Sequence, residues 1–376
     1  MRKIKWNHYI NYAVIGILTV VLAIFTFAGG LNQSLLYLLE KMAISIILAV
    51  SLSLVVGFLG ELSLGHAGFM CVGAYLGGKV ASLLVSTLGN GPLNFFISLL
   101  VGGAAAAICG IIIGIPALRL RGDYLAIVTL AFGEIVKSIF QNTSSETFGG
   151  AIGLSTPRYD KKYFFIFSFI LVLITLAVVQ NLIRSKHGRA ITSIRDNEIA
   201  AKASGINVTK YKLLAFTLSA TFAGIAGVLY SFSNYTVQSA KFGYNYSIEI
   251  LVMVVLGGMG SINGSIIAAA LITFLNTKLA TILTGDLAVL QNLLYAVILI
   301  LIVIYNNAPT LKSFRDRYNV GVLLRKLARK AHDPAHVKDD AAKWDVVPTK
   351  IEMNEVLSID VVPQDKQDLT GNGGDK

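Results

Sequence analysis

Apolar runs about as long as a bilayer crossing recur along most of this chain, and they constrain its fold more than any other feature. A helix needs about 20 apolar residues to cross a hydrocarbon core of roughly 30 Å. Only 14% of the 376 residues are charged, whereas a soluble domain carries about a quarter. The sequence therefore predicts an all-α, polytopic integral membrane protein with about eight to ten transmembrane or re-entrant helices. The runs occupy residues 12–27, 42–59, 62–88 (broken by glycines), 95–115, 123–140, 163–183, 213–232, 248–284 and 287–305.

The run at residues 248–284 is too long for one crossing. As a single helix its 37 residues would extend roughly 55 Å. The segment LGGMGSINGS, residues 256–265, contains Gly257, Gly258 and Gly260, and glycine readily adopts the conformations that turn a chain. We expect two short or re-entrant pieces that meet at this segment. Because unwound backbone at membrane depth lines cavities, the three glycines are also candidate residues of a substrate path.

A second glycine-rich segment, residues 57–78, places Glu61, Ser63 and His66 at or near membrane depth. An ionisable residue in the bilayer is a functional candidate because it is costly there, so these three residues join the candidate substrate path. The alternative is close helix packing through small residues, with Glu61 at a cytoplasmic turn and His66 hydrogen-bonded to a backbone carbonyl. We expect no metal site, because one histidine alone does not make a zinc site.

Glu134 and Lys137 also fall within an apolar run. They are three residues apart and so share one face of a helix, where a local ion pair lowers the cost of burying both charges. A proton relay would instead need a chain of unpaired carboxylates and histidines, which the sequence does not contain.

The sequence contains none of the common catalytic or nucleotide-binding motifs. It has no G-x-x-x-x-G-K-[ST] phosphate loop, no G-x-S-x-G elbow, no H-E-x-x-H and no paired-cysteine zinc pattern. We therefore predict no enzyme activity and no cofactor, and any use of ATP would require a partner subunit.

The net charge of +11 does not indicate a nucleic-acid partner. The basic residues cluster at span ends, at residues 184–212 and after Ala308, which is the positive-inside distribution and not one basic face. Six crossings from an inside start return the chain inside, so residues 184–212 and both termini are expected in the cytoplasm. Residues 1–308 form the predicted transmembrane domain, and residues 309–376 form a charged cytoplasmic tail that is partly disordered.

Residues 184–212 are polar and basic, and local signals predict a short folded helix within them. Asp196 can cap its start, Glu198 lies in its first turn, and Gly205 can adopt the left-handed conformation after its end. A second helix start is expected at Thr209. From these residues alone two interpretations stay open: a docking surface, or an ordinary loop whose Lys and Arg only set topology.

Four motifs resemble one known family. NEIAAKASGIN, residues 197–207, resembles the EAA-type cytoplasmic loop of bacterial ABC-importer permeases, whose coupling helix contacts the ATPase. GELSLGHAGF (60–69), RLRGDYLAIVTLAFGEI (119–135) and LGGMGSINGSIIAA (256–269) resemble, in the same order, the LivM type of branched-chain amino acid permease. The resemblance covers residues 42–305. The coupling residues that it implies, with the expected cap, are Asp196, Glu198, Ala200, Ala201 and Gly205.

The resemblance implies a permease subunit of an ABC importer in the bacterial cytoplasmic membrane, carrying leucine, isoleucine or valine. Its implied partners are a LivH-type permease, two cytoplasmic ATPase subunits, an extracytoplasmic substrate-binding protein and the lipid bilayer. A permease of a urea or short-amide importer is an alternative within the superfamily. A secondary transporter or channel is the alternative from another class, since glycine-broken helices occur there too.

Overall fold

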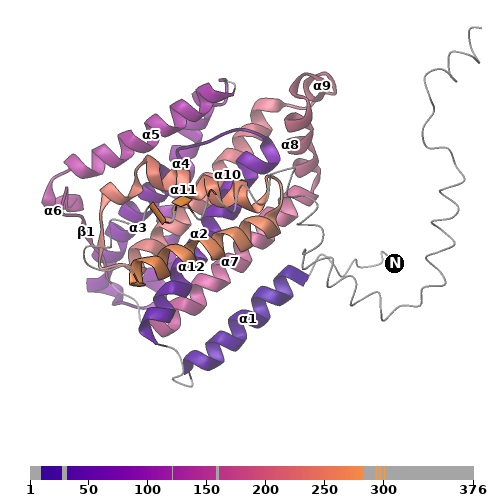
Figure 1. Cartoon of the computed structure of the whole chain (residues 1–376). Helices are drawn as coiled ribbons and strands as arrows, with labels where there is room; N and C mark the ends of the chain where they lie inside the picture. The colour runs from indigo at the N-terminus through magenta and orange to yellow at the C-terminus, as the bar shows by residue number, and fades with distance from the viewer. Residues whose placement is uncertain are drawn as a thin grey trace, which may run out of the picture. The chain divides into compact units, whose positions relative to one another are not determined.

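The computed structural model describes residues 10–27, 32–120, 122–157, 161–282, 293–294, 296–297 and 300. The predicted tail at residues 309–376 and most of the predicted last span lie outside these residues. Long helices dominate the described part, which confirms the all-α, polytopic fold (Figure 1). Six of them are long and apolar enough to cross a membrane: Gln33–Leu59, His66–Leu88, Pro92–Ala117, Phe164–Arg184, Val208–Ser233 and Ile262–Ile282.

The elements follow one another with short connections. The helices are α1 (Ile10–Phe27), α2 (Gln33–Ser53) continued by a π-helix, η2 (Leu54–Leu59), α3 (His66–Leu88), α4 (Pro92–Ala117), α5 (Asp123–Asn142), α6 (Ser145–Phe148), α7 (Lys161–Arg184), α8 (Lys186–Asp196), α9 (Glu198–Ala203), α10 (Val208–Ser233), a 3-10 turn η3 (Ser239–Phe242), α11 (Tyr244–Gly257) and α12 (Ile262–Ile282). Two short strands, β1 (Leu154–Ser155) and β2 (Thr236–Val237), pair antiparallel.

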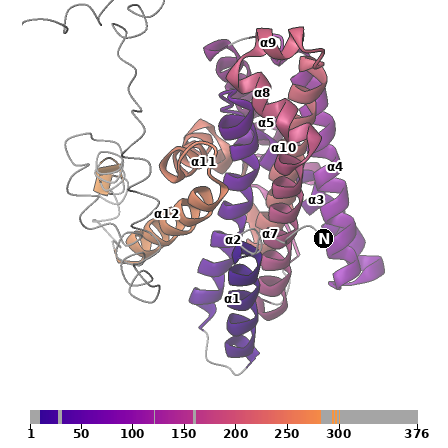
Figure 2. The same cartoon turned by 90° about the vertical axis from the view of Figure 1, so that its right-hand side faces the viewer.

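The long helices alternate in direction between two ends of the bundle. Helices α8 and α9 lie together at one end, at the top of Figure 2, which we call the α9 end. The β1–β2 pair joins the segment before α7 to the segment after α10, and it lies at the opposite end (Figure 1), which we call the β end. Helices α7 and α11 run toward the α9 end, and α10 and α12 run away from it.

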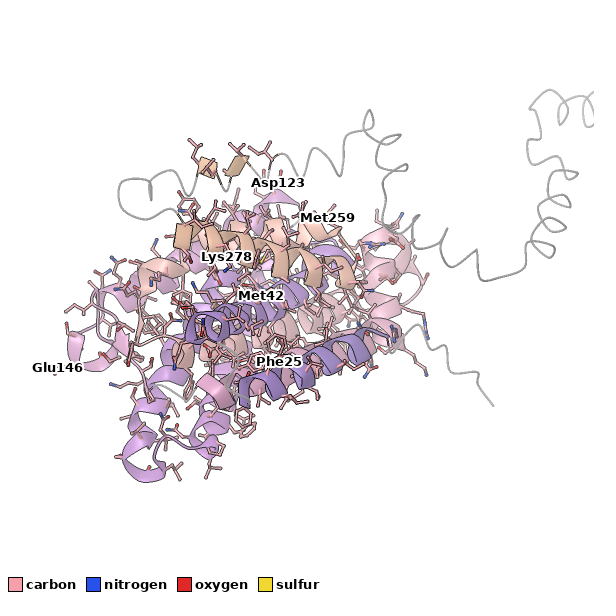
Figure 3. The ribbon with its side chains drawn as sticks, turned by 60° about the horizontal axis from the view of Figure 1, so that its bottom comes forward. Phe25, Met42, Asp123, Glu146, Met259 and Lys278 are labelled. Atoms are coloured by element: carbon pink, nitrogen blue, oxygen red, sulfur yellow. The ribbon has the colours of Figure 1, made fainter. Side chains whose placement is uncertain are left out.

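The centre of the bundle is formed by α3, α4 and α10, which approach one another through glycines. A Cβ on Gly73 of α3 would overlap the backbone of Gly224 in α10, and a Cβ on Gly227 would overlap the backbone of Met70. Small residues allow membrane helices to make this close backbone contact, where van der Waals packing replaces the hydrophobic effect. The outside of the bundle stays apolar, as at Phe25 of α1 (Figure 3), which is 55% exposed.

Two predicted boundaries were wrong, for physical reasons. Helix α2 begins at Gln33 and not at residue 42, because the helix continues through polar residues that have partners, such as Glu40, which accepts a 2.6 Å hydrogen bond from Ser233. The predicted run 62–88 starts as a helix only at His66 and is not broken by its glycines. Those glycines serve helix contact instead, while Gly60, at φ +79°, ends the π-helix.

The predicted break within residues 248–284 is confirmed. Helix α11 ends at Gly257 and α12 begins at Ile262. Between them Gly258 and Gly260 have φ values of +90° and +85°, which side chains with a Cβ rarely adopt. The turn also needs small residues for packing, because a Cβ on Gly57 of η2 would come within 2.6 Å of the Gly260 nitrogen.

Replacing Gly73 by alanine should destabilise the bundle. An exposed helical Gly→Ala change usually stabilises by roughly 0.5–1 kcal/mol, but here the added methyl forces apart two backbones, at a cost of about 1–3 kcal/mol. Thermal unfolding of the purified protein in detergent measures the difference. Gly16→Ala in α1, where nothing lies within 4 Å of the new methyl, is the control and should be neutral or stabilising. Equal effects of the two changes would contradict the close α3–α10 contact.

Candidate functional site

Helices α8 and α9 turn sharply between Asp196 and Glu198, and the residue that caps α9 is not the predicted one. Asp196 is the last residue of α8, and its carboxylate accepts hydrogen bonds from the Arg195 guanidinium, the shorter 3.0 Å long. Asn197 has the extended conformation that a helix cap requires, and its side-chain oxygen accepts a 3.0 Å hydrogen bond from the Ala200 amide. The predicted cap was wrong because Asp196 is still helical, as the last residue of the preceding helix α8, and Asn197 has the extended conformation instead.

The end of α9 follows the prediction. Gly205 has φ +81°, its amide donates to the Lys202 carbonyl, and the Ile206 amide donates to the Ala201 carbonyl. This pair of bonds is the Schellman motif, which places a left-handed residue after the helix end. Helix α10 then begins at Val208, one residue before the predicted start.

Helix α9 presents one face to the bundle and the other outward. Ala201 is buried, whereas Ala200 is exposed. Beside Ala200, Ile199 is 75% exposed. A single exposed apolar residue is common on protein surfaces, so the significance of Ile199 comes from its place on the outward face of a capped helix. The sequence analysis did not single out Ile199. An isoleucine within a charged stretch is the pattern that could have identified it.

A buried ion-pair cluster joins α9 to the bundle. Lys212 of α10 is 3% exposed, and its ammonium lies 2.5 Å from a Glu61 oxygen and 3.2 Å from a Glu198 oxygen. The sequence suggested for Lys212 only a topological role, and for Glu61 a place on the substrate path. The available signal was a lysine one turn inside an apolar helix, because a charge there needs a partner. The cluster brings together residues from three separate segments.

Arg195 makes a second connection at the same end. Its guanidinium donates a 3.0 Å hydrogen bond to the Gly57 carbonyl in η2, where the π-helix leaves carbonyl groups for other partners. The alkyl part of the Arg195 side chain covers Gly60, whose Cβ would come within 2.5 Å of it. The end of α8, the end of η2 and the α11–α12 turn are therefore in mutual contact.

The other candidate path residues lie near these contacts. Ser63 and His66 are each 2% exposed, and the His66 ring lies beside the backbone of Leu48 and the hydroxyl of Ser51, which is 2.8 Å from a ring nitrogen. Met259 marks the α11–α12 turn in Figure 3, which holds the predicted Gly258 and Gly260. A contact between any of these residues and a substrate stays a prediction.

The local ion pair in α5 is confirmed. Lys137 lies 2.5 Å from a Glu134 oxygen, and the other Glu134 oxygen accepts a 2.8 Å hydrogen bond from the Tyr244 amide at the start of α11. Within the described residues, histidine, cysteine and carboxylate side chains form no group of three that could hold a metal ion.

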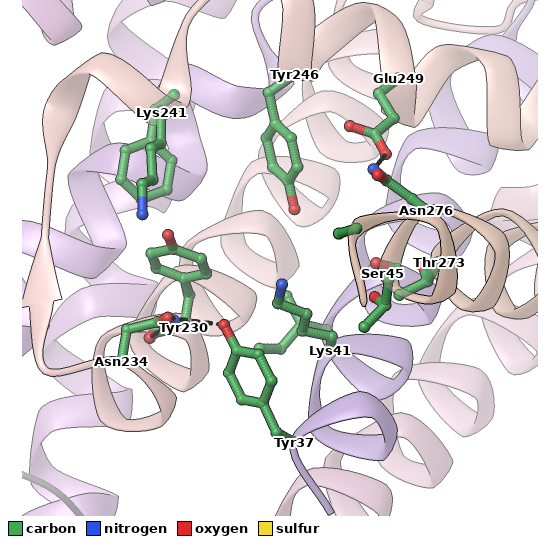
Figure 4. Close-up of a pocket in the computed structure, with 14 residues that line it drawn as sticks. Tyr37, Lys41, Ser45, Tyr230, Asn234, Lys241, Tyr246, Glu249, Thr273 and Asn276 are labelled. Atoms are coloured by element: carbon green, nitrogen blue, oxygen red, sulfur yellow. Dashed lines mark hydrogen bonds between the residues drawn. The ribbon is translucent and has the colours of Figure 1, made fainter. Parts of the chain in front are cut away.

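A cavity of about 360 Å³ lies away from these contacts, where α2, α10, α11 and α12 meet toward the β end (Figure 4). Its lining is mixed, with lysine, tyrosine and glutamate side chains beside apolar ones. None of the path residues predicted from the sequence lines it.

A polytopic helical bundle with a small cavity of mixed lining and a capped helix at one end that exposes an apolar residue is consistent with a membrane transport permease. The chain belongs to the family described as branched-chain amino acid transport system, permease component, whose model matches residues 34–304. This membership confirms a multi-pass membrane protein that is the permease component of a transport system.

Individual relatives agree with this family. The LivM permease of the high-affinity branched-chain amino acid system of Salmonella typhimurium strain LT2 is 38% identical over 261 residues, 61% of this chain and 60% of the relative. LivM of Escherichia coli strain K12 is 37% identical over 260 residues, with the same coverage. The ribose import permease RbsC of E. coli K12 is 26% identical over 73% of this chain and 86% of its own. The match therefore spans less than two thirds of either LivM protein. No solved structure matches.

Removing the Lys212 charge should destabilise the protein strongly. Lys212→Met leaves Glu61 and Glu198 without their shared cation, and an uncompensated buried charge costs about 3–5 kcal/mol. Thermal unfolding in detergent measures the loss, and the double variant Glu61→Gln with Lys212→Met should recover part of it. Lys137→Met is the control, because the Lys137–Glu134 pair is less buried, at 25% and 33% side-chain exposure against 3% for Lys212, and its loss should therefore be the smaller one. Equal losses in the two single variants would contradict the special role of the cluster.

Proposed function

We propose that this chain is a membrane-spanning permease subunit of an ABC importer for branched-chain amino acids. It works with a LivH-type permease, two cytoplasmic ATPase subunits that hydrolyse ATP, and an extracytoplasmic protein that delivers leucine, isoleucine or valine. The observation that carries the proposal is the α8–α9 segment: a capped helix with an outward apolar residue, Ile199, joined to the bundle through a buried ion-pair cluster. The names of the LivM relatives support the substrate class.

In this proposal α9 is the coupling helix. Ile199 and Ala200 contact the ATPase, Ala201 packs α9 on the bundle, and Gly205 sets the turn into α10. Asp196 and its neighbour Arg195 orient the preceding helix.

When ATP closes the ATPase dimer, α9 moves, and the Glu198–Lys212–Glu61 cluster moves α10 and the segment after η2 with it. The bundle then alternates between two arrangements. One opens the substrate path to the outside of the cell, and the other opens it to the cytoplasm.

The α9 end is cytoplasmic in this proposal, and the membrane is the bacterial cytoplasmic membrane. The basic residues of the 184–212 segment support this orientation through the positive-inside rule, and it places the β end and the cavity of Figure 4 outside. Both chain termini are then cytoplasmic. Ser63, His66 and the glycines of the α11–α12 turn, Gly257, Gly258 and Gly260, belong to the cytoplasmic part of the substrate path.

Replacing Ile199 by aspartate should weaken ATPase binding, because it puts a charge into an apolar contact. Co-purification of the ATPase subunits with tagged permease from native membrane should fall at least about tenfold, the effect of roughly 1.4 kcal/mol. Ile152→Asp is the control, because Ile152 is exposed to 76% against 75% for Ile199 but lies next to β1, at the β end. Loss of the ATPases in both variants, or in neither, would contradict α9 as the contact.

Gly205→Val should uncouple the complex. Valine at φ +81° costs about 1–3 kcal/mol in backbone strain, which the turn relieves by reorienting α9. Substrate-stimulated ATP hydrolysis of the assembled complex should fall severalfold, while membrane insertion is retained. Gly89→Val is a matched control: Gly89 has φ +64°, and nothing lies within 4 Å of its added methyl group, as at Gly205, but it follows α3 at the other end.

Transport by this chain alone under an ion gradient would contradict the proposal, because that behaviour belongs to a secondary transporter or channel. If the partner binding protein delivers urea or a short amide, the assignment as an ABC permease stands and the assigned substrate changes. Uptake assays of the purified chain alone and of the complete complex separate these outcomes.

A further inference from the structure

The cavity toward the β end is built from parts of four helices and from the 3-10 turn η3, which contributes Lys241 and Phe242. The first turns of α2 contribute Tyr37 and Lys41, the last turn of α10 contributes Tyr230, α11 contributes Tyr246 and Glu249, and the second half of α12 contributes Thr273. Its volume of about 360 Å³ is near the lower end of the range of about 300–1,000 Å³ that is usual for small-molecule sites. A solute of the size of a single amino acid fits such a space.

Two cationic side chains point into this space. In Figure 4 the Lys41 ammonium and the Tyr230 hydroxyl approach from one side, and the Lys241 ammonium and the Tyr246 hydroxyl approach from the other. The Lys41 ammonium lies 4.6 Å from the centre of the Tyr37 ring, a cation–π distance. Among the described residues neither lysine has a carboxylate within ion-pair distance. The cavity therefore has the electrostatics of a site for an anionic group.

The opposite charge is present at one edge of the same cavity. Glu249 of α11 accepts a 3.0 Å hydrogen bond from the Asn276 side chain of α12, and Figure 4 shows the pair beside Thr273 and Ser45. The hydrogen bond from Asn276 fixes the position of the carboxylate. The cavity thus holds the Glu249 carboxylate on one side, the Lys41 ammonium near the middle and the Lys241 ammonium on the opposite side (Figure 4).

An unsatisfied polar atom gives an independent indication of a ligand. The Thr273 hydroxyl is buried and has no hydrogen-bond partner among the described residues, and its side chain is only 7% exposed. A buried hydroxyl without a partner is unfavourable. Thr273 lines the cavity, so a polar group bound there would satisfy it.

We propose that this cavity binds the transported solute as a zwitterionic α-amino acid. The solute carboxylate lies between Lys41 and Lys241, its ammonium lies at Glu249 with the Thr273 hydroxyl, and its aliphatic side chain lies against Ile44 and Phe242, which also line the cavity. This inference rests on the proposed function. It specifies the site at the extracytoplasmic end of the bundle where the solute first binds. A sugar or urea would bring no charge to match the lysines and the glutamate, so the charges favour the amino acid.

The test uses the complex of both permeases and both ATPases, purified without binding protein, and measures equilibrium binding of radiolabelled L-leucine. Leucinamide lacks the carboxylate and 4-methylpentanoate lacks the ammonium, so each should compete at least about tenfold more weakly than leucine, since a hydrogen bond to a charged group has about that effect. Lys41→Gln and Lys241→Gln should each weaken leucine binding at least about tenfold for the same reason.

Two further variants separate ligand binding from a structural effect. Thr273→Val removes an unsatisfied buried hydroxyl, so a merely structural role predicts equal or higher thermal stability, whereas the proposal predicts leucine binding about fivefold weaker. Lys278→Gln on α12 is the control for charge, because Lys278 lies on the same helix outside the cavity, with its ammonium near the Phe274 ring. It should bind leucine as the unaltered complex does.

Uptake of leucine by the complete complex with its binding protein, reconstituted in vesicles, is measured in parallel. Uptake by the unaltered complex, together with unchanged leucine binding in the two lysine variants, would overturn the cavity assignment and leave the proposed function standing. Absence of saturable leucine binding in a complex that takes up leucine would do the same. Absence of uptake of leucine, isoleucine and valine by the unaltered complex would overturn the proposed function and the cavity assignment together.

Discussion

The buried ammonium of Lys212 is the interaction on which the α9 end of this protein depends. It lies between Glu61, from the segment after the π-helix, and Glu198, from α9. Removing a charge from water costs several kcal/mol, and only a close partner of opposite charge offsets that cost. The three segments are therefore held at short distances from one another, because any separation leaves a charge buried without compensation. Helix α9, which its own caps keep helical, is thereby held against the start of α10.

Direct backbone contacts at glycines connect further helices of the bundle to those that the ion-pair cluster joins. The end of η2 contacts the α11–α12 turn through Gly57 and Gly260, and α3 contacts α10 through Gly73 and Gly224. Where backbones touch directly, no flexible side chain lies between them to absorb a displacement. In the proposed mechanism, a shift of α9 is therefore passed to η2, α10 and the α11–α12 turn as a movement of whole helices.

The features that local sequence determines were the ones that could be predicted. The spans follow from apolar runs, the break between α11 and α12 from length and glycine, the left-handed Gly205 from its place after a helix, and the Glu134–Lys137 pair from helical spacing. The features that were missed depend on residues distant in sequence. Glu61 and Lys212 are 151 positions apart, so the position of Lys212 signals that it needs a partner but no local pattern identifies that partner. The cavity combines α2 with α11 and α12 and has no local signature. The cap at Asn197 was missed for another reason: adjacent Asp196 and Asn197 are equally good caps, and only the geometry of α8 decides between them.

The two ends of the molecule share the same pair of helices. Helix α10 begins near Lys212 in the ion-pair cluster and reaches the cavity at Tyr230, a distance of about 27 Å along a helix. Helix α2 runs the other way, from Lys41 in the cavity into the π-helix whose Gly57 carbonyl binds Arg195. A rotation of α10 against α2 therefore changes both sites at once. Under the proposed mechanism this rotation alters the position of α9 and the distance between Tyr230 and Lys41 across the cavity, so solute binding in the proposed site and the position of α9 are thermodynamically linked in both directions.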